Sequence, residues 1–158
     1  MFAVIVMVAG VLMAAWIGFG RAAFGIGGEF VIVYTLLAGT TIAALNIAAG
    51  RYIAKTKRNG FSTQARTVVA LIVAWFGALM FGLTVADFKD GNLHSVIGSL
   101  GDAGLLGISI GLSNLFGIMT LGGSIAAVVF SRLDSRGPKP EEVPDDVDFV
   151  QPLPPPLP

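Results

Sequence analysis

The chain contains no cysteine and only one histidine, His94, among its 158 residues. The lack of cysteine excludes disulfides, thiolate metal ligands and cysteine nucleophiles, and a single histidine cannot build a multi-histidine metal site. Charged residues are also scarce, at 13% against about 25% in ordinary soluble domains. The formal net charge is zero, so nothing favours a nucleic-acid partner. We expect no cofactor and no metal.

Hydrophobic residues, by contrast, make up 54% of the chain, and the mean hydropathy is +0.81. Four apolar segments contain no Asp, Glu, Lys, Arg or His, at about residues 2–19, 30–50, 67–86 and 104–130. Each approaches or exceeds the roughly 20 residues that cross a bilayer core. We therefore predict an all-α integral membrane protein, a bundle of four transmembrane helices within residues 1–131. The fourth segment exceeds the required length, which predicts tilt or an end that leaves the lipid.

The first segment differs from a secretory signal because no basic residue precedes it. We interpret it as a retained helix, with cleavage after the Ala22–Ala23 region as the alternative.

Basic residues are distributed unevenly among the links. The link between the second and third segments has five cations and no acid: Arg51, Lys55, Lys57, Arg58 and Arg66. The tail begins with Arg132, Arg136 and Lys139, whereas the first and third links hold one cation each, Arg21 and Lys89. The positive-inside rule predicts that the basic link and both termini are cytoplasmic. The basic link should also attract anionic lipid headgroups.

The third link has a short helical pattern. Its apolar residues fall at i, i+3, i+4 and i+7: Leu93, Val96, Ile97 and Leu100. Asn92 is a suitable N-cap and Gly101 a suitable stop. The pattern predicts a short amphipathic helix in the membrane interface.

Charged residues in the outer links offer two weak motifs. Asp87, Asp90, His94 and Asp102 could bind a metal or sense pH, but we expect a solvated polar loop because the match is loose. Arg21 and Glu29 flank the glycine-rich turn of the first link, and we expect at most an exposed pair there, which contributes little.

Two helices carry stripes of small and weakly polar residues, spaced to share one face. In the fourth segment the stripe is Ser109, Ser113, Gly117, Thr120 and Ser124, and in the second it includes Thr35, Gly39, Asn46 and Gly50. Small residues allow helices to approach closely in lipid, so we interpret both stripes as helix contacts. The alternative is that the Ser/Thr stripe lines a water-filled path.

The fourth segment has a second small-residue face, formed by Gly107, Gly111 and Asn114. Either this helix is central in the bundle, or the face meets another subunit. Asn46 and Asn114 are the most polar groups at membrane depth, and we expect them to form hydrogen bonds between helices rather than to bind a ligand. Trp75 lies mid-span, and we expect it to pack against a neighbour or a lipid chain.

The final residues change in composition. Five acids, at positions 141, 142, 145, 146 and 148, precede a proline-rich end at 152–158. We expect residues 132–158 to be a disordered cytoplasmic tail, whose PxxP-like spacing suits a cytoplasmic partner with an aromatic groove.

The spans contain no ionisable group for catalysis or proton transport, so we expect a non-enzymatic protein. One class is an accessory, assembly or regulatory subunit of a larger membrane complex. The other is a self-assembling small pore or holin-like oligomer that perturbs membranes. The composition, rich in Ala, Gly and Val, indicates a bacterial protein of the plasma (inner) membrane.

Overall fold

The computed structural model describes residues 1–137 and contains four helices long and apolar enough to cross a membrane. The first span joins α1 (Phe2–Phe19) to the 3-10 turn η1 (Gly20–Phe24). The second joins α2 (Val31–Val33), the π-helical η2 (Tyr34–Gly39) and α3 (Thr40–Arg58). The last two spans are α4 (Ala65–Thr84) and α5 (Ala103–Asp134). The prediction of four helices long and apolar enough to span a membrane is confirmed.

The last helix is longer than predicted. We expected the tail to begin at residue 132, but α5 continues to Asp134 because its last turn is held against the start of α4 by the Asp134 carboxylate. The acidic and proline-rich parts of the predicted tail lie outside the described residues.

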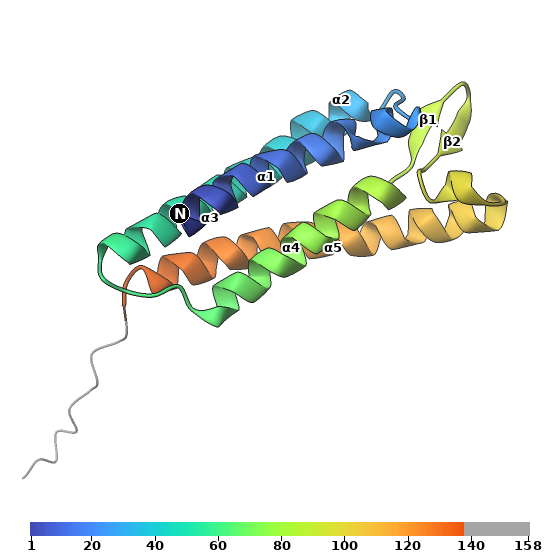
Figure 1. The fold of residues 1–158 in the computed structure, drawn as a ribbon. Helices are drawn as coiled ribbons and strands as arrows, with labels where there is room; N and C mark the ends of the chain where they lie inside the picture. The colour runs from blue at the N-terminus through green and yellow to red at the C-terminus, as the bar shows by residue number, and fades with distance from the viewer. Residues whose placement is uncertain (138–158) are drawn as a thin grey trace, which may run out of the picture.

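The four spans pack in a ring in which α1 neighbours α3, α3 neighbours α5, α5 neighbours α4 and α4 neighbours α1. Figure 1 shows α4 and α5 running side by side, with the α1 and α3 layer above them. Met1, the 59–64 link and Gly137 lie together at one end, which we call the basic end. The opposite end, which carries the small sheet, is the hairpin end.

The second span contains a widened turn. Around η2 the Thr35, Thr40 and Thr41 hydroxyls donate to carbonyls four residues earlier, those of Val31, Leu36 and Leu37. Such bonding competes with the helical pattern and often bends helices. The turn brings Gly39 against α1, where a Cβ would lie 3.2 Å from the Ala14 carbonyl oxygen.

The third link is a β-hairpin, so the predicted amphipathic helix is wrong. β1 (Asp87–Lys89) pairs antiparallel with β2 (Asn92–His94), and only a 3-10 turn, η3 (Gly98–Leu100), follows. The loop is Asp90–Gly91, with φ of 52° and 81°. Positive φ at both positions and an Asp-Gly sequence are typical of a type I′ turn. A two-turn helix has no intrinsic stability to compete with this turn.

The core consists of two apolar clusters at different depths. One centres on Val6, Ala49 and Leu71, and the other on Ile17, Ile42 and Ala78. Asn46 lies between Ile42 and Ala49 along α3 and is itself buried. A thin polar layer therefore divides the core of the bundle.

Candidate functional site

The Ser/Thr stripe of α5 faces the interior of the bundle. Ser109, Ser113, Thr120 and Ser124 are all buried, and Gly117 lies against Phe81. The Ser109 hydroxyl donates to the Thr84 carbonyl at 2.9 Å and accepts from the Ser95 hydroxyl at the same distance. The hydroxyls of Ser113 and Thr120 donate to carbonyls of their own helix. The hydroxyls of Ser109, Ser113 and Thr120 thus each have a hydrogen-bond partner within the protein.

Close contact between α4 and α5 depends on two glycines. A Cβ on Gly77 would lie 2.9 Å from the Thr120 backbone nitrogen, and one on Gly123 would lie 2.8 Å from that of Ala74. No side chain fits at either position. Small residues thus permit the backbone approach that stabilises helix pairs in lipid.

The stripe of the second span faces α1. Gly39 and Gly50 are buried, and a Cβ on Gly50 would lie 3.0 Å from the Ala3 carbonyl oxygen. Thr35 fills the space left by Gly18, and Asn46 fills the space left by Gly10. This stripe is therefore the contact of α3 and η2 with α1.

Asn46 forms a hydrogen-bonded layer across three helices. The Trp75 indole N–H donates to Asn46 Oδ1 at 3.0 Å, and Asn46 Nδ2 donates to Ser124 Oγ at 3.4 Å. Asn46 Nδ2 also donates to the Ile42 carbonyl at 2.9 Å. The expectation of a helix-linking hydrogen bond is confirmed for Asn46. Trp75 packs against the cluster centred on Val6, Ala49 and Leu71, as expected, and in addition supplies one donor of this layer.

At the hairpin end, Arg21 forms a wholly buried ion pair with Asp87. Arg21 NH1 lies 3.2 Å from Asp87 Oδ2, and both side chains are 0% exposed. Two expectations are thereby corrected, because Arg21 pairs with Asp87 rather than with Glu29, and Asp87 is not part of a solvated loop. The hairpin turns Asp87 inward. The sequence pattern of the third link does not predict this orientation.

The two partners of this pair are satisfied unequally. Asp87 accepts from the backbone N–H groups of Gly28, Phe30 and Phe88, at 2.8–3.0 Å. The Arg21 guanidinium lies 4.6 Å from the Tyr34 ring centroid and makes one long bond, 3.5 Å, to the Ala86 carbonyl. Its Nε and NH2 atoms have no partner among the described residues. Asp87 thus organises the loop that precedes α2. The buried charge of Arg21, in turn, is compensated by the Asp87 carboxylate.

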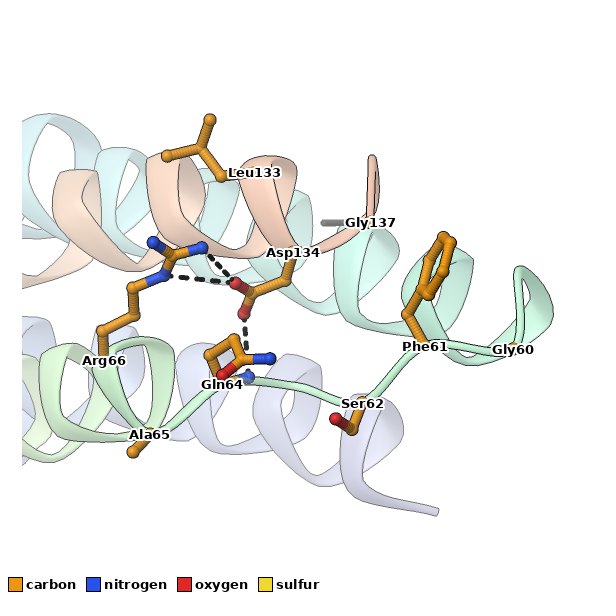
Figure 2. Close-up of a pocket in the computed structure, with 9 residues that line it drawn as sticks. All are labelled: Gly60, Phe61, Ser62, Gln64, Ala65, Arg66, Leu133, Asp134 and Gly137. Atoms are coloured by element: carbon orange, nitrogen blue, oxygen red, sulfur yellow. Dashed lines mark hydrogen bonds and ion pairs between the residues drawn. The ribbon is translucent and has the colours of Figure 1, made fainter. Parts of the chain in front are cut away.

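A second ion pair closes the basic end. Figure 2 shows Arg66 and Asp134 pointing toward one another. Both residues line a cleft of about 550 Å³ between the 60–66 segment and the end of α5. Asp134 accepts from Arg66 NH2 at 2.8 Å, from the Thr67 hydroxyl at 2.7 Å and from the Gln64 N–H at 3.0 Å. A carboxylate at the N-terminus of α4 also interacts favourably with the helix dipole. With these donors in place, the carboxylate acts as a structural cap.

The cations near the C-terminal end of α3 are exposed. Arg51, Lys55, Lys57 and Arg58 all lie on the surface of the last two turns of α3. Arg51, Lys55 and Arg58 border a groove of about 360 Å³ with Ala48 and Tyr52. Arg51, Lys55 and Arg58 therefore form a continuous basic face.

The second small-residue face of α5 is exposed on the outside of the bundle. Gly107, Gly111 and Asn114 are exposed, and a Cβ on either glycine would meet no atom within 4 Å. Helix α5 is thus not central in the bundle, so a central position does not explain its second small-residue face. Gly122, in register with this face and equally open, extends it by two turns. The i+11 spacing of Gly122 from Gly111 is the sequence signal that places it on this face.

Within residues 1–137, no group of three or more His, Asp or Glu side chains is arranged to hold a metal ion. Asp102, one of the acids considered for such a site, instead caps α5 by accepting from the Gly104 and Leu105 N–H groups at 3.1 Å. Comparisons with protein-family models, curated proteins and solved structures found no match to this chain.

Proposed function

We propose that the protein is a non-enzymatic, multi-pass membrane subunit that binds other membrane protein subunits in an accessory, assembly or regulatory role. One observation carries this proposal: the face of α5 formed by Gly107, Gly111, Asn114 and Gly122 is exposed. We call it the open face. It combines the small residues of a helix-packing surface with an amide at membrane depth.

The position of Asn114 supports a protein partner. It lies eleven residues after Ala103, the first residue of α5, or about 17 Å along the helix axis. That depth is close to the middle of a hydrocarbon core about 30 Å thick. An amide facing lipid chains finds no hydrogen-bond partner there, whereas a neighbouring helix can provide one.

The polar groups of the bundle interior also favour a structural role. Asn46, Asp87 and Asp134 are each engaged by several hydrogen bonds. A general base or a proton carrier needs a group free to exchange its proton. These groups instead join helices and loops to one another.

The charge distribution supports a location and an orientation. The exposed cations of α3 lie at the same end as Met1 and Gly137. We propose that this end is cytoplasmic, in a bacterial plasma membrane, because positive charge is retained on that side. Labelling of single engineered cysteines at Ser62 and Asp90 by a membrane-impermeant reagent tests this orientation. In sealed cells, labelling at position 90 alone agrees with it, and labelling at position 62 alone reverses it.

The proposed function is tested by native mass spectrometry of the intact assembly, extracted in a mild detergent from its own membrane. We expect stoichiometric subunits unrelated to this chain, lost in Gly111→Leu and Asn114→Leu. The matched control is Ala44→Leu, which enlarges an exposed residue on α3 away from the open face. Retention of the same subunits by both open-face variants would contradict the proposal.

Self-association through the open face is the alternative, because a second copy could equally supply the partner helix for Asn114. The pore or holin-like function belongs to this outcome. It predicts a homo-oligomer of defined number without other subunits, and conductance of planar bilayers containing the purified protein. Ser113→Ala and Thr120→Val then test the Ser/Thr stripe. They are preferable to leucine, since Thr120 lies against Gly77 and enlargement would disturb the bundle.

A further inference from the structure

The basic face of α3 lacks a carboxylate partner among the described residues. Arg51, Lys55 and Arg58 recur at i, i+4 and i+7, so they project from one side of the helix. The two ion pairs formed within residues 1–137 use other cations, Arg21 and Arg66. Three positive charges at one helical face repel one another unless an anion lies between them.

The described region ends near the C-terminal end of α3. Asn59 Nδ2, one residue after α3, donates to the Ser135 carbonyl at 2.9 Å. Gly137 packs against the Phe61 ring, where a Cβ would lie 2.5 Å from the nearest ring carbon, and its φ is +78°. Gly137, the last described residue, therefore lies next to the C-terminal end of α3.

The sequence that follows has the complementary charge. Five acids occur between positions 141 and 148: Glu141, Glu142, Asp145, Asp146 and Asp148. The four residues from Gly137 to Glu141 span up to about 14 Å when extended. Arg51 and Arg58 are separated by about 10 Å along the helix axis. The acidic segment is thus long enough, and begins near enough, to cover the whole basic face.

We propose that the acidic segment, residues 141–148, binds the basic face of α3 within the same molecule. A short connection gives the segment an effective concentration in the millimolar range at this face. Binding neutralises cations that would otherwise attract anionic lipid headgroups, each by about 1 kcal/mol.

Paramagnetic relaxation enhancement in the full-length protein tests this proposal. The chain has no cysteine, so Val147→Cys provides a single site for a nitroxide label between Asp146 and Asp148. In phosphatidylcholine nanodiscs at low salt, we expect enhanced relaxation of the backbone amides of residues 51–58. Amides of the hairpin, at the opposite end of the bundle, should be unaffected and provide the internal reference.

Charge variants show whether the contact is the proposed one. Asp145→Asn with Asp146→Asn should remove most of the enhancement. The matched control, Glu29→Gln with Asp90→Asn, changes the net charge equally at exposed positions of the hairpin end and should leave it unchanged. At 1 M salt the Debye length falls to about 3 Å, so the enhancement should largely disappear.

Three results would overturn the proposal. They are an absence of enhancement at residues 51–58, an enhancement unchanged by the two tail substitutions, and loss of the enhancement when phosphatidylglycerol replaces half of the phosphatidylcholine. The last result would assign the basic face to lipid headgroups instead of the tail.

Discussion

Gly122 and Gly123 are adjacent in α5 but lie in opposite environments. A Cβ on Gly123 would lie 2.8 Å from the Ala74 backbone nitrogen, whereas a Cβ on Gly122 would meet nothing within 4 Å. One glycine is therefore required by the contact between α4 and α5, and the other belongs to the open face. The glycine pair does not interrupt the helix, which runs unbroken from Ala103 to Asp134.

The first prediction compares leucine substitutions at these two positions. Gly123→Leu should lower the free energy of unfolding by about 3 kcal/mol, because the added side chain meets backbone that cannot move aside. Gly122→Leu should change it by less than about 0.5 kcal/mol. Reversible unfolding in mixed micelles, followed by circular dichroism, measures both. Equal losses would show that the contact between α4 and α5 is misplaced.

The second prediction concerns the buried pair at the hairpin end. Asp87→Asn should lower the free energy of unfolding by about 3–5 kcal/mol, since it leaves the Arg21 charge buried without a counter-ion. Arg21→Met should cost less, because Asp87 retains three backbone N–H donors. The same unfolding assay ranks the two variants. As a control, Glu29→Gln should have almost no effect, because Glu29 is exposed; a larger loss there than in Asp87→Asn would refute the buried pair.

The third prediction separates the partners of the pair at the basic end. Asp134→Ala should lower the free energy of unfolding by about 2–3 kcal/mol, since the Gln64 N–H and the Thr67 hydroxyl lose their acceptor. Arg66→Ala should lower it by about 1 kcal/mol or less, because the Arg66 side chain is 49% exposed. Hydrogen exchange should localise the Asp134→Ala effect to the first turn of α4. A greater loss from Arg66→Ala would mean that the ion pair outweighs the cap.

The fourth prediction addresses the polar layer in the core. In a double-mutant cycle of Asn46→Ala and Trp75→Phe, we expect a coupling energy of about 0.6 kcal/mol, with an upper bound of about 1.7 kcal/mol. The coupling reports the hydrogen bond from the indole N–H to Asn46 Oδ1. Leu115→Ala, on the exposed side of α5, is the control partner for Asn46→Ala and should show no coupling. Additive losses for Asn46 and Trp75 would exclude an energetically significant bond.

The hairpin shows where local pattern fails. Leu93, Val96, Ile97 and Leu100 have helical spacing, yet Leu93 lies in β2 and Val96 is buried before η3. The Asp90–Gly91 turn was the stronger signal in this segment, because positive φ at both positions reverses the chain within two residues. A short apolar period carries little weight beside such a turn.

The amino-acid sequence by itself determined the number of spans, their approximate limits and the concentration of cations at one end. An uncharged apolar run of sufficient length must satisfy its backbone hydrogen bonds internally, and a helix achieves this without reference to the rest of the chain. The tertiary structure alone decided that Arg21 pairs with Asp87, that the Ser/Thr stripe faces inward and that the open face does not. Those choices depend on distances between segments remote along the chain, where hydrogen bonds and close backbone contacts select one rotation of each helix over others of similar hydrophobicity.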